Sequence, residues 1–182
     1  MMYGLPKSLQ VCGVDYPIRV DYRAVLDICT ALADPELTEE EKWEVALDVM
    51  YPDFKQMPPE HYKEALEQCF WFIRCGQDES SVQGPKLVDW EQDFPYIAAP
   101  INRVLGIEIR SVPELHWWSF MSAYYEIGDC LFAQVVRIRD AQAKGKKLEK
   151  AEAEWLRQNR HLVDFKRKYT DADDEFFKQF AY

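Results

Sequence analysis

The chain has 182 residues, of which 48% are hydrophobic and 30% charged, and its formal net charge is −10. This composition is typical of a globular protein and excludes a disordered chain. The acidic net charge argues against a general nucleic-acid binder. No apolar run approaches the roughly 18 residues that a membrane-spanning helix needs. The first ten residues lack the basic and apolar blocks of a signal peptide, so we expect a cytoplasmic protein.

A β-hairpin is the first predicted element, at 8–19, where apolar and polar residues partly alternate on either side of Gly13. A helix with Asp21 as its N-cap should follow and end at Asp34-Pro35. Everything after the hairpin is predicted to be helical.

The second helix should begin after Thr38, where Glu41 completes a capping box, and end at Tyr51. Its expected apolar face consists of Trp43, Ala46, Leu47 and Met50. Prolines 58 and 59 suit the first turn of a third helix that ends at Gly76. A polar linker at 76–86 comes next.

The fourth helix is predicted to start near Asp93, with Pro95 in its first turn, Pro100 inside it and Gly106 at its end. A short extended connection is expected to contain Ile107, Ile109 and Val112. Ser111 or Glu114 should then open the longest helix. Its apolar stripe is formed by Trp117, Phe120, Met121, Tyr124, Ile127, Leu131, Val135 and Ile138.

The charge is unevenly distributed along the chain. Residues 1–136 carry 10 basic and 23 acidic side chains, 137–168 carry 11 and 5, and 169–182 carry 1 and 4. We therefore expect a mainly α single domain at 1–182, a small helical bundle with an N-terminal β-hairpin. It would comprise the hairpin, a helical core at 21–140, a basic helical arm at 141–168 and a short acidic-aromatic segment at 169–182.

Catalysis requires a constellation of residues, and none is evident: the chain has no phosphate-binding glycine loop and no His-Glu-x-x-His pair. His116 could bind a metal together with Asp93 or Glu114, but a histidine at a helix start is more often a hydrogen-bonded packing residue. We expect no catalytic site, no metal and no cofactor.

The basic arm carries Trp155 among its lysines and could bind the phosphates of a nucleic acid. Four interleaved acidic residues and the acidic body oppose a polyanion, so a solvated helix face or a contact with an acidic protein surface fits better. The phenylalanines at 176, 177 and 180 either dock on the core or insert into a partner's groove.

Three stretches resemble a known family. They are LPKSLQVCGVDYPIRVDYRAVLDI near the start, LVDWEQDFPYIAAPINRVLGIEI followed by LHWWSF in the centre, and VVRIRD further on. The His-Trp-Trp triplet after a Gly-Ile-acid step carries most of the specificity. The matching positions are Asp93, Tyr96, Ile97, Gly106, Ile107, Glu108, Leu115, His116, Trp117, Trp118, Phe120, Ile138 and Arg139. The chain thereby resembles the bacteriophage gp-fifteen family of tailed phages and prophages of Gram-positive bacteria.

The resemblance implies a non-enzymatic tail assembly chaperone in the host cytoplasm. Such a protein binds the tape-measure protein, helps recruit tail-tube subunits and is absent from the mature virion. A structural tail component and a small metal-dependent enzyme are the alternatives, and self-association stays open. We expect neither nucleic acid nor membrane as a partner. The candidate partner-binding residues are Trp117, Trp118, Phe120, Trp155, Phe176, Phe177, Phe180, Lys146, Lys147 and Lys150. Of these, Trp117 and Phe120 are expected in the core.

Overall fold

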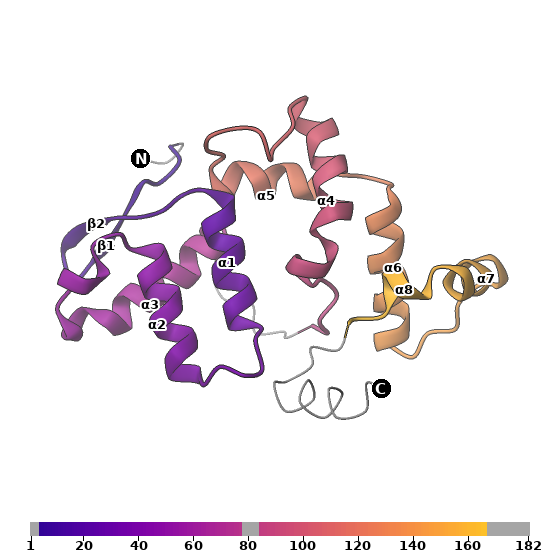
Figure 1. The fold of residues 1–182 in the computed structure, drawn as a ribbon, viewed down its shortest axis with the longest axis horizontal. Coiled ribbons are helices and arrows are strands. Elements are labelled where there is room, and N and C mark those ends of the chain that lie inside the picture. The colour runs from indigo at the N-terminus through magenta and orange to yellow at the C-terminus, as the bar shows by residue number, and fades with distance from the viewer. Residues whose placement is uncertain (1–3, 78–83, 167–182) are drawn as a thin grey trace, which may run out of the picture.

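The computed structural model describes residues 4–77 and 84–166, and this part of the chain is mainly helical with an N-terminal two-stranded hairpin (Figure 1). The predicted fold class is thus confirmed. The elements in order are β1 (Ser8–Val11), β2 (Val14–Pro17), α1 (Tyr22–Leu32), α2 (Glu39–Met50), η1 (Phe54–Gln56), η2 (Pro59–His61), α3 (Tyr62–Ile73), α4 (Trp90–Leu105), α5 (Trp117–Tyr125), α6 (Leu131–Ala143), α7 (Lys150–Gln158) and α8 (Arg160–Val163).

The hairpin forms where it was predicted, and β1 and β2 are antiparallel with Leu9 opposite Tyr16. The turn residues Cys12 and Gly13 both have positive φ, 49° and 78°. Positive φ at both positions matches the turn to the right-handed twist of the strands, and glycine adopts it without strain. Leu9 and Val11 are buried, so β1 covers one side of the helical core.

Side-chain caps start α1 and α2 at the predicted residues. Asp21 accepts a hydrogen bond from the backbone N–H of Arg23, and Thr38 and Glu41 form a complete capping box. The predicted face of α2 needs one correction: Ala46, Leu47 and Met50 are buried, whereas Trp43 is 44% exposed. Helix α1 packs against α2. Trp43 lies one turn before the buried Leu47, so the apolar face of α2 continues into its exposed surface.

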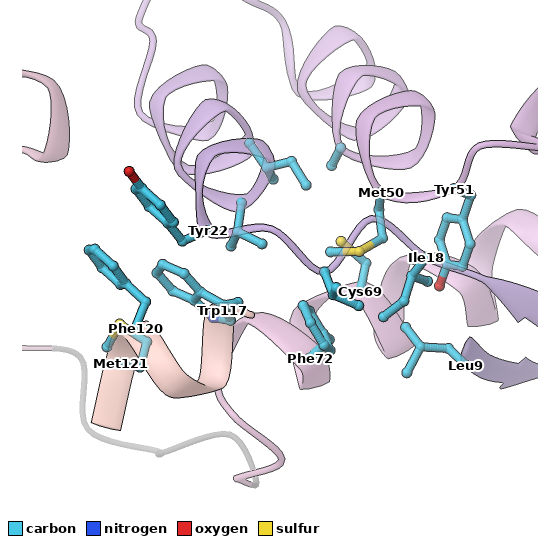
Figure 2. Packing of buried hydrophobic residues seen from close by; sticks show 14 of the residues in the cluster. Leu9, Ile18, Tyr22, Met50, Tyr51, Cys69, Phe72, Trp117, Phe120 and Met121 are labelled. Atoms are coloured by element: carbon cyan, nitrogen blue, oxygen red, sulfur yellow. The ribbon is translucent and has the colours of Figure 1, made fainter. Parts of the chain in front are cut away.

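The core joins α1, α2, α3, α4, α5 and the hairpin. Figure 2 shows Met50, Cys69 and Phe72 packed between Ile18 and Trp117. Further along, the rings of Tyr22 and Phe120 stack at 4.7 Å with an interplanar angle of 1°. One continuous cluster therefore holds the N-terminal helices against α5.

The start of α4 differs from the prediction. The helix begins at Trp90, and the Asp89 side chain caps it by accepting from the N–H of Gln92. Asp93 lies one turn inside and its carboxylate accepts from the N–H of Asp89. Pro95 consequently falls beyond the first turn, while Pro100 inside the helix and Gly106 after its end are as predicted.

The expected longest helix is in fact two helices, α5 and α6, and α4 is longer than either. Gly128, with φ of 60°, lies in the break, and the Cys130 Sγ accepts from the N–H of Ala133 to start α6. The sequence predicted one long helix because apolar residues continue at helical spacing from α5 across the turn into α6. The segment before α5 also forms turns instead of an extended connection, although Ile109 is buried as an anchor.

The basic helical arm was predicted at 141–168, but residues 141–143 are the end of α6. After a turn at Gly145, α7 lies at the edge of the molecule and α8 packs against α6 (Figure 1). Residues 167 and 168 lie outside the described part of the chain. The aromatic segment at 169–182 lies outside the described residues. Within 4–77 and 84–166, no helix is both long and apolar enough to cross a membrane.

Candidate functional site

The predicted core residues Trp117 and Phe120 are buried, with 2% and 0% exposure, and their rings stack at 5.5 Å. Trp118 is half-buried and packs against Trp71 and Phe72. The two indole N–H groups donate to the last turn of α3, Trp117 to the carbonyl of Ile73 and Trp118 to that of Phe72, both at 2.9 Å. The Trp117 indole therefore supplies a donor to the Ile73 carbonyl at the end of α3, and the Trp118 indole gives the Phe72 carbonyl a second donor beside the N–H of Cys75.

His116 is the N-cap of α5. Its Nδ1 accepts from the N–H of Trp118 at 3.0 Å, and its Nε2 is 2.9 Å from the carbonyl of Pro6. These two partners correspond to a neutral imidazole that carries its proton on Nε2. Both ring nitrogens thus form hydrogen bonds, as predicted for a packing histidine at a helix start.

Asp93, the suggested metal partner of His116, instead forms a buried ion pair with Arg139 of α6 at 2.6 Å. Arg139 also donates to the carbonyls of Leu87, Leu162 and Val163. Among the described residues no group of three or more His, Cys, Asp or Glu could hold a metal ion. Asp93 and His116, the residues suggested as metal ligands, thus each have other partners in the structure.

The candidate residues of the basic arm lie elsewhere. Lys146, Lys147 and Lys150 are exposed, and Trp155 is half-buried on α7. Figure 1 places α7 at the opposite end of the molecule from the hairpin, well separated from α5. The structure therefore does not bring the lysines together with the tryptophan pair, and Phe176, Phe177 and Phe180 lie outside the described residues.

An apolar groove of about 950 Å³ lies on the outer side of α2 and α3, and sequence reasoning missed it. It is lined by Glu40, Trp43, Glu44, Leu47, Phe54, Lys55, Pro59, Tyr62, Lys63, Leu66, Glu67 and Phe70. We call this surface the α2–α3 groove. Seven of these twelve residues are apolar or aromatic.

Two helix faces and a short connection build the groove. Helix α2 contributes positions 40, 43, 44 and 47, and α3 contributes 62, 63, 66, 67 and 70, each set at the spacing of one helix face. The buried Phe54 of η1 contacts Tyr62 with ring centroids 5.0 Å apart, which closes the surface where the chain passes from α2 to α3. Among the large hydrophobic side chains that line the groove, Trp43 is the exposed one, at 44%.

The charges of the groove are arranged along the chain. Glu40 and Glu44 line it from the first two turns of α2, and Glu67 adds a carboxylate from α3. Lys55 and Lys63 line it from η1 and the start of α3, and all five side chains belong to exposed residues. The α2 side is therefore acidic, and the lysines lie where the chain leaves α2.

One feature of the sequence could have revealed the groove. Helix α3 carries two apolar stripes: Ala65, Cys69 and Phe72 are buried in the core, whereas the stripe of Tyr62, Leu66 and Phe70 is only partly buried. A surface helix needs only one apolar stripe to pack on a core. The surplus apolar width of α3, together with Trp43 on α2, is the signal of an outward-facing apolar surface.

A family model described as Bacteriophage Gp15 protein matches residues 1–165. The match thus spans the hairpin and α1 to α8. No curated protein and no solved structure matches the chain.

Proposed function

Since the chain belongs to the Bacteriophage Gp15 protein family, we propose that it is a non-enzymatic tail assembly chaperone that binds the tape-measure protein. In this role it acts in the host cytoplasm, helps recruit tail-tube subunits and leaves before the virion is complete. Family membership supports a phage protein, and the tail assembly role is our inference from the resemblance and the surface of the molecule.

The observation that carries this proposal is the α2–α3 groove. A long helical protein exposes apolar stripes until it is assembled, and a chaperone must cover them. Grooves between two helices, with apolar walls, bind amphipathic helices by burying their apolar side chains. Trp43, at 44% exposure, is an aromatic side chain of the kind that dominates binding energy in such interfaces.

The net charge of −10 supports the same role. Repulsion between acidic copies keeps a protein with an exposed apolar groove in solution. The exposed lysines at 146, 147 and 150 on the basic arm, with the half-buried Trp155, then form a second contact surface of opposite charge.

Co-expression with the cognate tape-measure protein tests the proposal. We expect the tape-measure protein to be soluble with this chain and to aggregate without it, and the two should co-purify. Equal solubility of the tape-measure protein in the presence and absence of this chain would refute the chaperone role.

Mass spectrometry of purified particles tests the second half of the proposal. A chaperone that leaves should be missing from virions or present far below one copy per tail. Stoichiometric presence would identify a structural tail component instead.

A further inference from the structure

We propose that the α2–α3 groove binds two turns of an amphipathic α-helix of the partner protein, with anchoring apolar side chains at i, i+4 and i+7 and lysine or arginine on the flank that faces Glu40 and Glu44. This inference rests on the proposed function, because it takes the occupant to be a segment of the tape-measure protein. It adds the sequence pattern that such a segment must have.

The length of the groove determines the number of anchors. On α2 the lining residues run from Glu40 to Leu47, and on α3 from Tyr62 to Phe70. At a rise of about 1.5 Å per residue these faces are roughly 10 and 12 Å long. A ligand helix of the same length spans i to i+7, which is two turns and presents three side chains on one face.

The chemistry of the walls selects large apolar anchors. Leu47 and Phe54 are buried, with exposures of 4% and 9%, and form the deep part of the surface. Trp43 on one side and the partly buried Leu66 and Phe70 on the other give it apolar walls. A leucine, isoleucine or phenylalanine entering between them removes apolar surface from water on both partners.

The acidic side of the groove selects the charge of the flank. Lys42, the one basic residue within α2, forms an ion pair with Glu39 at 2.9 Å. Glu40 and Glu44 have no ion pair within the described residues, so they are available to a ligand. Basic residues beside the anchors would complement these carboxylates, whereas acidic residues would be repelled.

Fluorescence anisotropy with labelled peptides and the full chain tests the inference. The first probe is a helix-forming peptide of about 16 residues with leucine at i, i+4 and i+7 and lysine on one flank; the second carries glutamate in place of each lysine. We expect the lysine peptide to bind about fivefold or more tightly than the glutamate peptide. The double variant Glu40→Lys/Glu44→Lys should reverse this preference.

Two variants locate the binding site. Trp43→Ala should weaken binding of the lysine peptide about tenfold or more, since aromatic anchors carry much of the binding energy. Tyr125→Ala is the matched control, because Tyr125 is an aromatic side chain at 67% exposure that does not line the groove, and it should leave binding unchanged. Equal effects of the two variants, or an unchanged charge preference in the double variant, would overturn the inference.

Other occupants give different results. If both peptides fail to bind and Trp43→Ala reduces the mass of the protein in light scattering, the groove is a contact between copies of this chain. If only a peptide of residues 169–182 binds, the occupant is the chain's own terminal segment. Either result refutes a partner helix in the groove.

The failure of the inference can be told apart from that of the proposed function. A tape-measure protein that aggregates without this chain but is equally soluble with the wild type and with the Trp43→Ala variant shows that the chaperone role is correct and that the groove is not its binding site. If the peptides bind with the expected charge preference but this chain does not change the solubility of the tape-measure protein, the inference that the groove binds a helix is correct and the chaperone role is refuted.

Discussion

Arg139 and Asp93 are 46 positions apart in the chain and form a bidentate ion pair, with Nη1–Oδ2 at 2.6 Å and Nη2–Oδ1 at 3.0 Å. Both side chains are almost completely buried, at 2% and 1% exposure. The pair joins α4 to α6, and the remaining guanidinium N–H groups donate to the carbonyls of Leu87, Leu162 and Val163. One arginine therefore ties the basic arm to the body of the protein.

We predict that Arg139→Met lowers the free energy of unfolding by about 3–5 kcal/mol, because it leaves the Asp93 carboxylate buried without its partner. Urea denaturation measures the loss. Arg137→Met is the matched control: Arg137 pairs with Glu152 at the surface, where such pairs contribute about 0–1 kcal/mol. Similar losses in the two variants would contradict a special role for the buried pair.

Two tryptophans should differ sharply in their effect on stability. Trp117→Ala removes a ring that is 2% exposed, and we expect a loss of about 3–5 kcal/mol. Trp43→Ala truncates a ring that is 44% exposed, and the loss should be about 1 kcal/mol or less. Thermal unfolding of both variants measures this difference. A large loss for Trp43→Ala would show that this side chain supports the core.

The N-cap residues of α1 and α2 should contribute unequally to the free energy of unfolding. Thr38→Ala removes one exposed cap and should cost about 1 kcal/mol. Asp21→Ala should cost more, because Asp21 also accepts from the N–H of Leu115 at 2.8 Å and pairs with Arg23. Urea denaturation ranks the two variants. The reverse order would mean that the link between Asp21 and the segment before α5 adds no stability.

Glu108 should make stability depend on pH in the acid range. Hydrogen bonds from the Arg110 guanidinium and backbone, with a further bond from Asn102, lower its pKa from 4.5 to about 2. A carboxylate whose pKa is lower in the folded state stabilises above the unfolded value, and this stabilisation is lost as the pH falls from about 4.5 towards 2. We therefore expect Glu108→Gln to lower the melting temperature at pH 7, with the difference from wild type vanishing near pH 2.

Glu114→Gln provides the comparison for this pH series. Glu114 is exposed in the same connection, and none of the described residues forms an ion pair with it. Its replacement should leave the melting temperature unchanged throughout. A Glu108→Gln difference that persists at pH 2 would indicate lost packing rather than lost charge.

Most helix and strand boundaries followed from the sequence because they depend on residues close together in the chain. The capping box of Thr38 and Glu41 and the cap at Asp21 act over two or three positions. The start of α4 was predicted wrongly because Asp89 and Asp93 lie one turn apart and aspartate at either position is a suitable N-cap. The break at Gly128 was missed because an apolar stripe continues across it.

The candidate site depended on information that periodicity does not contain. An apolar stripe shows that a helix face avoids water but not whether another helix covers it. The side chains of Leu66 and Phe70 are as apolar as those of Cys69 and Phe72, yet the former pair lines the groove and the latter lies in the core. Only the packing of α3 against α2, β1 and α5 distinguishes these two faces.

By itself the sequence determined a helical protein with an N-terminal hairpin, the caps of its first helices and the burial of Trp117 and Phe120. The tertiary structure alone decided that Asp93 pairs with Arg139 and that Trp43 faces outward onto a groove. The physical reason is the distance along the chain over which each kind of interaction acts. Hydrogen bonds at helix ends act between near neighbours, whereas burial and buried ion pairs depend on which distant elements meet.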